Sequence, residues 1–270
     1  MESRSGYSRL MKKASLVGAF FVPAIWLCGA QASCPLPGEL PEAAVQRVVD
    51  GDTLYLEDGR RVRMIGLNSP ELGKRGRADE PFAVAARQRL EALVAASAGR
   101  VKVSPGRDDR DDYGRTLAHV YDRQGRNLEE QLIAEGLGFV VAVAPNVDLV
   151  ECQQAAERQA RQARLGVWKK SPITRAEQIK APGFALISGR VDSVQRNRGG
   201  IWIELQGAVV LHIAPNSQRN FDASALKRLE GRTIEARGWV VDRARRGETK
   251  PGQARWMLPL TDPAMLQPVL

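Results

Sequence analysis

Histidine is scarce in this chain, and its scarcity removes whole classes of catalytic site. The 270 residues include only two histidines, His119 and His212, and each falls in the middle of a strand-like stretch. The chain therefore has too few histidines to favour a histidine general base, a histidine-ligated zinc ion or a serine–histidine–aspartate triad. The sequence also lacks a phosphate-cradling GxxxxGK stretch. Carboxylates, arginines and backbone oxygens remain for chemistry, and we expect both histidines to be structural.

Long apolar runs are lacking too, apart from residues 14–28 near the start. This run follows a basic segment and precedes Ala30-Gln31-Ala32, a small-x-small pattern of the kind that signal peptidases cut. We therefore predict a cleaved signal peptide over residues 1–32, and export to a periplasm or to the medium. The alternative is an uncleaved membrane anchor, but the run is short for a spanning helix and Pro23 interrupts it.

Cysteine is nearly as rare, with three residues in all. Cleavage after residue 32 would leave Cys34 and Cys152, and an even pair in an oxidising compartment is a disulfide candidate. Two unpaired thiols are the alternative, because the sequence does not give the distance between their Cα atoms.

Net charge is unevenly placed along the chain, which has a formal net charge of +9. Residues 33–170 hold 21 basic and 21 acidic side chains, whereas residues 171–270 hold 15 basic and 9 acidic ones. A basic surface attracts polyanions such as nucleic acid. The excess over residues 171–270 therefore favours a polyanionic partner, although a modest excess also serves solubility.

The first part of the chain after residue 32 alternates strand and helix signals in a set order. Strand-like runs cover 44–49, 52–57, 61–67, 100–104 and 116–122. Helical patterns with start and stop residues cover 81–98, 128–135 and 148–165. A closed five-stranded barrel with a helix between its third and fourth strands is the OB arrangement. We predict a mainly β, α+β fold, with an OB-fold barrel and three helices over residues 33–170.

A second, smaller OB-like barrel is predicted over residues 184–270, after a linker at 171–183. Its strand-like runs cover 185–195, 200–206, 208–214, 232–241 and 254–260, with a helix at 222–229. The two units show no sequence identity, so they are not a strict internal repeat.

Chemistry-bearing residues gather around the first two hairpins of the first barrel. Asp52 follows the first Asp-Gly turn, and Asn68-Ser69 ends the third strand, so a twisted sheet can bring these points together. Carboxylate, amide and carbonyl oxygens suit a hard cation such as Ca²⁺. Arg63 and Arg115 are the guanidinium groups that would grip a phosphate, and Glu71 is the candidate base for a water molecule.

At these residues the chain resembles the thermonuclease family, staphylococcal nuclease and its relatives. DGDT at 50–53, Arg63, SPE at 69–71 and DYGR at 112–115 stand in the family's order and spacing. The resemblance covers roughly 45–168. It implies metal binding by Asp52, Asn68 and the backbone oxygen of Ser69.

The resemblance also implies a calcium-dependent cleavage of DNA and RNA that leaves 3′-phosphates. It assigns Arg63 and Arg115 as the catalytic arginines and Glu71 as the general base or a water-orienting group. Tyr113 is a candidate substrate contact.

Three departures from the family pattern are visible, and each weakens binding rather than chemistry. Asn68 stands where the family has a second metal-binding aspartate, so the site loses one negative charge. Ala142 and Ala144 stand where two nucleotide-contacting tyrosines are expected, and Asp112 stands in place of a lysine.

In the second unit, Trp202 and Trp239 alternate against the apolar residues of their strands. Together with Arg196 and Arg198 they are candidates for a base-stacking platform. Core or interdomain packing explains the two tryptophans equally well.

We therefore predict an exported, calcium-dependent nuclease that acts on DNA, with RNA as an open alternative. We expect a monomer that does not stay inserted in a membrane. The second barrel would hold substrate, so deleting 171–270 should weaken DNA binding and leave the chemical step largely intact. Two rival hypotheses stay open: a nucleic-acid-binding scaffold without catalysis, and an envelope interaction protein.

Overall fold

The computed structural model describes residues 33–74, 76–247 and 252–269. The predicted signal peptide at 1–32 lies outside the described residues. These described residues group into one compact unit. Within the described residues, none of the helices has the length and apolar character needed to cross a membrane.

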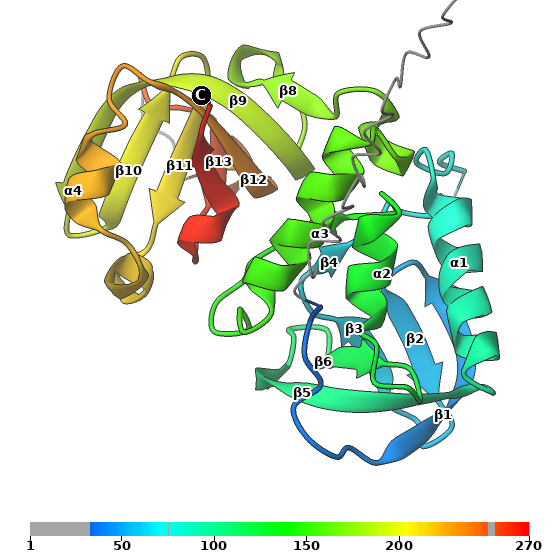
Figure 1. Cartoon of the computed structure of the whole chain (residues 1–270). Coiled ribbons are helices and arrows are strands. Elements are labelled where there is room, and N and C mark those ends of the chain that lie inside the picture. The colour runs from blue at the N-terminus through cyan, green and yellow to red at the C-terminus, as the bar shows by residue number, and fades with distance from the viewer. Residues whose placement is uncertain (1–32, 75, 248–251, 270) are drawn as a thin grey trace, which may run out of the picture. The chain divides into compact units, whose positions relative to one another are not determined.

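A closed five-stranded barrel forms the first half of this unit (Figure 1). Its strands are β1 (Glu42–Asp50), β2 (Thr53–Leu56), β3 (Arg61–Met64), β5 (Arg100–Arg110) and β6 (Thr116–Tyr121). The order around the barrel is β1-β2-β3-β6-β5, and only the β3–β6 pairing is parallel. This is the OB arrangement that the alternation of strands and helices predicts, so that fold class is confirmed.

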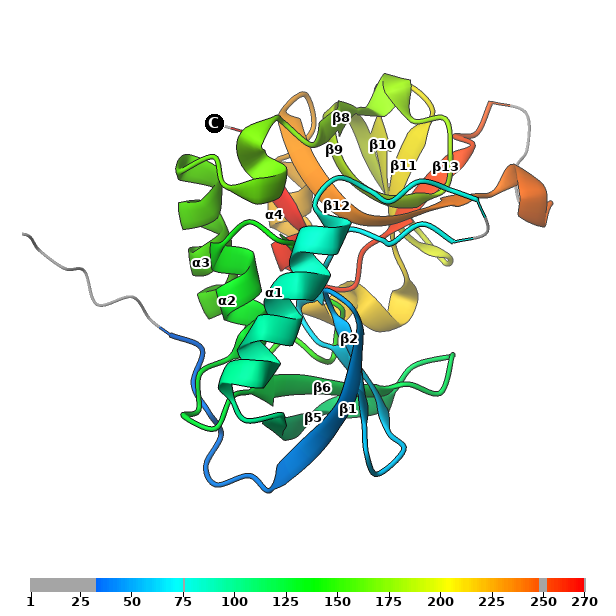
Figure 2. The same ribbon diagram turned by 90° about the vertical axis from the view of Figure 1, so that its right-hand side faces the viewer.

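Three helices gather against this barrel (Figures 1 and 2). They are α1 (Ala83–Ala96), α2 (Leu128–Ala134) and α3 (Val150–Gln162). Leu90 of α1 and Leu132 of α2 are fully buried in one cluster with the barrel residues Leu54 and Val62. The Asn127 side chain accepts a hydrogen bond from the amide of Glu130, as expected of an N-cap, and so fixes the start of α2.

The stretch predicted as one strand over 61–67 is interrupted, and that part of the prediction is wrong. β3 ends at Met64, and the chain turns at Gly66, whose φ is +82°. A Cβ atom on Gly66 would overlap the side chain of Gln153, which also donates to the carbonyl of Ile65. Beyond the turn, β4 (Leu67–Asn68) leaves the barrel and pairs with β7 (Phe139–Val140).

The strand predicted at 100–104 is longer than expected. β5 continues to Arg110, where it still pairs with Thr116 of β6. A register irregularity between Pro105 and Arg110 accommodates the charged residues that read as a loop in the sequence.

A second β-sheet occupies the rest of the chain. Its strands are β8 (Ile173–Arg175), β9 (Gly183–Asn197), β10 (Gly200–Leu205), β11 (Val209–Ile213), β12 (Thr233–Asp242), β13 (Trp256–Pro259) and β14 (Leu266–Pro268). The pairings β9–β10–β11–β13–β12–β9 close a ring in which only β11–β13 is parallel. The helix α4 (Ala223–Lys227) lies between its third and fourth strands. The second sheet therefore repeats the strand order of the first barrel.

The remaining regular structure is short. The 3₁₀ helices are η1 (Gly166–Lys169), η2 (Ala176–Gln178), η3 (Pro215–Asn220), η4 (Ala244–Arg246) and η5 (Pro263–Met265). The segment predicted as a linker, 171–183, contains β8, which pairs in parallel with β9. The exact domain boundaries stay a prediction.

A buried network of ion pairs joins helix α3 to strand β12. Arg237 Nη1 lies 2.6 Å from Glu157 Oε2 and also donates to the carbonyl of Val140 at 3.3 Å. Glu157 Oε1 in turn accepts the amide of Val140 at 2.7 Å. Next to this pair, Arg161 donates two hydrogen bonds to Glu235, at 3.0 and 2.9 Å. The second barrel is therefore attached to α3 by ion pairs, and to β7, the strand that pairs with β4, by the hydrogen bond from Arg237.

A disulfide joins Cys34 to Cys152, with 5.3 Å between the Cα atoms. The two residues are separated by 118 positions in the sequence. Cys34 is buried with Tyr121 and Leu149. The bond therefore ties the beginning of the described chain to α3 and closes a covalent loop that contains all five strands of the first barrel.

Candidate active site

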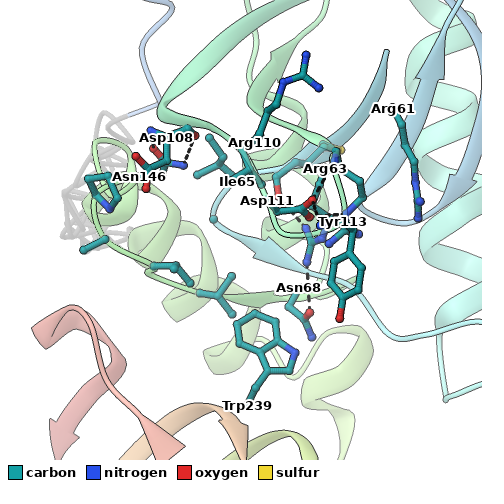
Figure 3. A pocket seen from close by; sticks show the side chains of 18 of the residues that line it. Arg61, Arg63, Ile65, Asn68, Asp108, Arg110, Asp111, Tyr113, Asn146 and Trp239 are labelled. Atoms are coloured by element: carbon teal, nitrogen blue, oxygen red, sulfur yellow. Dashed lines mark hydrogen bonds and ion pairs between the residues drawn. The ribbon is translucent and has the colours of Figure 1, made fainter. Parts of the chain in front are cut away.

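A cavity of about 780 Å³ lies where the β3–β4 segment, the β5–β6 connection and strand β12 meet (Figure 3). Arg63, Glu71 and Arg115 all line it. These three residues come from separate segments of the chain, and the fold brings them to one hollow. Asn68 and Tyr113 also lie on its wall.

Asp52 is buried directly behind this wall. Its Oδ2 atom accepts hydrogen bonds from the amide of Ser69 at 2.8 Å and from the hydroxyl of Ser69 at 3.0 Å. Its Oδ1 atom accepts from the hydroxyl of Thr53 at 3.0 Å. The first hairpin and the end of β4 are therefore held together through one carboxylate. A Cβ atom on Gly51 would lie 2.7 Å from that of Ser69, so only glycine allows this close approach.

Asp50 supports the same turn, as the sequence predicts. Its carboxylate accepts a hydrogen bond from the amide of Asp52 at 3.2 Å. Burial, followed by the nearby charge of Asp52, raises the pKa of Asp50 to about 6. Two carboxylates in one buried turn therefore repel each other, and a cation would relieve that repulsion.

Arg63 lies between Asp52 and Asn68. Its Nη2 atom is 3.3 Å from Asp52 Oδ2 and 3.3 Å from Asn68 Oδ1. Its Nη1 atom donates to the carbonyls of Met64 and Leu67, each at 2.7 Å. The guanidinium is thus fixed by three contacts within the β3–β4 segment and one to Asp52 in the β1–β2 turn, and it places a positive charge at the cavity wall.

Arg115 is held from the other side by Asp111. Its Nε atom donates to Asp111 Oδ2 at 2.6 Å, and its amide donates to Asp111 Oδ1 at 2.9 Å. Burial opposes ionisation of Asp111, but hydrogen bonds from Arg115 outweigh it and lower the pKa of this carboxyl. Within the described residues no hydrogen bond engages the two Nη atoms of Arg115, so they remain available to a ligand.

Glu71 differs from Asp52 and Asp111 in having a free carboxylate. Its backbone pairs with Glu80, through its amide to the Glu80 carboxylate at 2.9 Å and through its carbonyl to the Glu80 amide at 3.0 Å. Its own carboxylate has no hydrogen bond or ion pair among the residues that the structure describes, and it is exposed on the cavity wall. Glu71 therefore offers an unpaired carboxylate to the cavity that Arg63 and Arg115 also line.

The predicted metal ligands are brought together, and their chemistry fits a hard divalent cation. Asp52 Oδ2 and Asn68 Oδ1 both contact Arg63 Nη2, so a cationic atom already lies between them. Ser69 adjoins Asn68 and is bound to Asp52. In the described part of the chain, no group of three or more His, Cys, Asp or Glu side chains is arranged to hold a metal. The site therefore offers one carboxylate with neutral oxygens, and the expected affinity is low.

The predicted stacking platform in the second barrel is not brought together as one surface. Trp239 lines the cavity described above, whereas Trp202 does not. Trp202 stacks on His212, with ring centroids 4.0 Å apart, and its indole N–H donates to Asn197. Arg196 and Arg198 are exposed and also lie outside the cavity lining.

Several cavity residues were missed by the sequence reasoning. Arg61, Lys74 and Arg110 add positive charge to the wall, and Asp111 orients Arg115. One of them was within reach of the sequence. Arg61 precedes Arg63 by two positions on one strand, and this spacing places both side chains on the same face.

The comparison with family models identifies the first barrel. The model described as "Staphylococcal nuclease homologue" matches residues 61–170. This match begins at β3, contains Glu71 and Arg115, and ends before β8.

Individual relatives agree with this match. The chain is 33% identical over 137 residues to SPbeta prophage-derived endonuclease YokF of Bacillus subtilis. The matched region covers 49% of this chain and 46% of YokF. It is 32% identical over 137 residues to endonuclease YncB of the same organism, covering 49% of this chain and 64% of that protein. Thermonuclease of Staphylococcus intermedius is 32% identical over 129 residues, covering 47% of this chain and 75% of that protein. The chain thus spans less than two thirds of YokF and YncB.

Proposed function

The chain belongs to the staphylococcal nuclease homologue family, and from this premise we propose that it is a calcium-dependent nuclease that hydrolyses phosphodiester bonds of DNA, with RNA as an open alternative substrate. The observation that carries the proposal is the convergence of Arg63, Arg115 and Glu71 on one cavity. A scaffold that only binds nucleic acid has a use for the two arginines, but not for an unpaired carboxylate in the same cavity, which would repel phosphate.

Each side chain has a distinct task in the proposed reaction. The Nη atoms of Arg115 and the guanidinium of Arg63 hold the phosphate and stabilise the charge that develops on its oxygens. Glu71 accepts a proton from the attacking water. A calcium ion, when bound by Asp52, Asn68 and the backbone oxygen of Ser69, supplies Lewis-acid polarisation of the phosphate. Asp52, buried and bonded to Ser69, keeps these oxygens in place.

The test is cleavage of a labelled single-stranded oligonucleotide by the chain, with calcium and with chelator. We expect calcium-dependent cleavage that falls by about 10²- to 10⁴-fold in Glu71→Gln, since a general base contributes that much. We expect a similar loss in Arg115→Ala. The matched controls are Glu151→Gln and Arg107→Ala, because both residues are exposed and lie outside the cavity lining. Equal losses in the controls, or cleavage that survives both site substitutions, would refute the assignment.

A non-catalytic nucleic-acid-binding scaffold is the second candidate, and one observation favours it. The metal ligands include a single carboxylate, Asp52, which Arg63 already neutralises at 3.3 Å. On this hypothesis the chain binds the oligonucleotide with the same affinity in calcium and in chelator and never cleaves it.

We also propose that the chain functions after export, in an oxidising compartment. The Cys34–Cys152 disulfide supports this, because disulfides persist in secreted and periplasmic proteins and are rare in the cytosol. Cell fractionation tests the proposal, and recovery of the chain with two free thiols in the cytosol would contradict it.

A further inference from the structure

Trp239 belongs to the second barrel but lines the cavity of the first. It lies on β12, two positions after Arg237, so the two side chains share one face of that strand. Val240, on the opposite face, is buried in the core of the second barrel. Trp239 therefore lies outside that core, and it is 40% exposed.

The indole ring is fixed by a row of aromatic contacts. It packs edge-on against Phe184, with centroids 5.3 Å apart and planes at 64°. Phe184 lies 5.6 Å from Phe139, which pairs with Asn68 across the β4–β7 ladder. The ring is thus held in a set position beside the strand that carries Asn68. Figure 3 shows the Asn68 side chain between the rings of Trp239 and Tyr113 in that view.

A second exposed ring and an excess of positive charge share this cavity. Tyr113 is 82% exposed and lies beside Arg115, whose guanidinium carbon is 5.5 Å from the ring centroid. Arg61, Arg63, Lys74, Arg110 and Arg115 line the wall, against Glu71, Asp108 and Asp111. A ligand that matches the basic wall and the two rings carries negative charge along its backbone and has flat apolar groups beside that backbone. Single-stranded nucleic acid has this chemistry, whereas a duplex keeps the faces of its bases stacked inside.

We propose that Trp239 stacks on a nucleobase next to the phosphate that Arg63 and Arg115 hold. The second barrel then supplies a base-binding surface to the site in the first barrel, and single-stranded substrates are preferred over duplexes. This inference rests on the proposed function, because it takes nucleic acid as the ligand of that cavity. It assigns Trp239 a role in substrate specificity and no role in proton transfer.

The experiment measures binding of a labelled single-stranded oligonucleotide by fluorescence anisotropy in chelator, where no cleavage interferes. The panel consists of Trp239→Ala, Trp239→Leu and Trp239→Phe in the full chain. Leucine keeps apolar contact with Phe184 but has no aromatic face for stacking. Phenylalanine keeps both the contact and an aromatic face. We expect affinity to fall by about 5- to 150-fold in the alanine and leucine variants, and by much less in the phenylalanine variant.

Oligonucleotides with one abasic site, placed at each position in turn, separate stacking from a structural effect. At the contacted position the abasic site should weaken binding of the unmodified chain by the same factor, and should not weaken binding of Trp239→Ala any further. Equal affinities of the leucine and phenylalanine variants, or additive losses at every abasic position, would overturn the inference.

Failure of the proposed function gives a different result. If the chain does not cleave in calcium but shows the coupling between Trp239 and one base, the nuclease assignment fails and the stacking assignment stands. If it cleaves without that coupling, the nuclease assignment stands and the stacking assignment fails. A duplex competitor adds a further readout: preference for single strands should fall in Trp239→Leu and persist in Trp239→Phe.

Discussion

Substituting Arg237 by methionine tests how firmly the second barrel is attached to the first. The side chains of Arg237 and Glu157 are only 5% and 8% exposed to solvent, and their closest atoms are 2.6 Å apart. Removing the arginine leaves the buried Glu157 carboxylate with the amide of Val140 as its remaining hydrogen-bond partner, and it also removes the 3.5 Å contact between Arg237 Nη2 and Glu235 Oε1. Breaking a buried pair in this way costs about 3–5 kcal/mol. We therefore expect Arg237→Met to lower the free energy of unfolding by that amount.

The assay is urea unfolding followed by circular dichroism, with Arg107→Met as the matched control. Arg107 also pairs with an aspartate, Asp148, but the two side chains are 64% and 54% exposed. An exposed pair contributes only about 0–1 kcal/mol. The slope of the free energy against urea should stay constant for the two free energies to be comparable.

A double variant, Arg237→Met with Glu157→Gln, isolates the cost of the stranded charge. Glutamine keeps a side-chain oxygen for the amide of Val140 but carries no charge. We expect the double variant to be more stable than Arg237→Met alone. The reasoning is refuted if Arg237→Met lowers the free energy of unfolding no more than Arg107→Met does. It is also refuted if the loss in the double variant equals the sum of the losses in Arg237→Met and Glu157→Gln.

Three further predictions concern the disulfide, the metal ligands and the acid stability of the site. Reducing Cys34–Cys152, which closes a separation of 118 residues, should lower the free energy of unfolding by about 2–5 kcal/mol; identical urea curves with and without dithiothreitol would contradict this. Asn68→Asp adds a second carboxylate next to Asp52, so the calcium concentration that gives half-maximal cleavage should fall several-fold, and an unchanged calcium titration would argue against Asn68 as a ligand. Asp111 has a lowered pKa in the folded chain, below its ordinary 3.8, so its contribution to stability is present above that value and is lost as the pH falls through the lowered pKa. Asp111→Asn should therefore flatten the acid side of the stability curve, which urea unfolding at a series of acidic pH values measures.

Local sequence signals predicted most of the elements of this fold. The Asp-Gly pairs at 50–51 and 58–59 mark the first two hairpin turns, and Asn127 caps its helix as expected. These signals act over a few residues and therefore do not depend on the rest of the chain.

The errors arose where distant residues decide the local conformation. The turn at Gly66 is accommodated by Gln153, which lies on α3. The extension of β5 to Arg110 depends on pairing with Thr116, although a charged stretch reads as a loop. Neither partner is visible from the local pattern.

The residues of the candidate site also divide into those that local patterns predict and those that depend on distant contacts. Asp52, Arg63 and Asn68 lie on adjacent hairpin elements, so their proximity follows from alternation and turn position. Trp202 and Trp239 have the same phase relative to the apolar residues of their strands, and nothing local distinguishes them. The attachment of β12 to α3 holds Trp239 at the cavity, whereas Trp202 lies on β10, outside the cavity lining.

The link between Arg237 and Val140 bears on how such a chain can be divided. A fragment that stops at residue 170 keeps Glu157 and loses the arginine that neutralises it. It also uncovers the amide of Ala144, which Thr261 engages at 3.1 Å. The fragment therefore exposes the Glu157 carboxylate next to β7, the strand that pairs with the one carrying Asn68. Joining either half to an unrelated domain would therefore require a new partner for the charge of Glu157 or of Arg237.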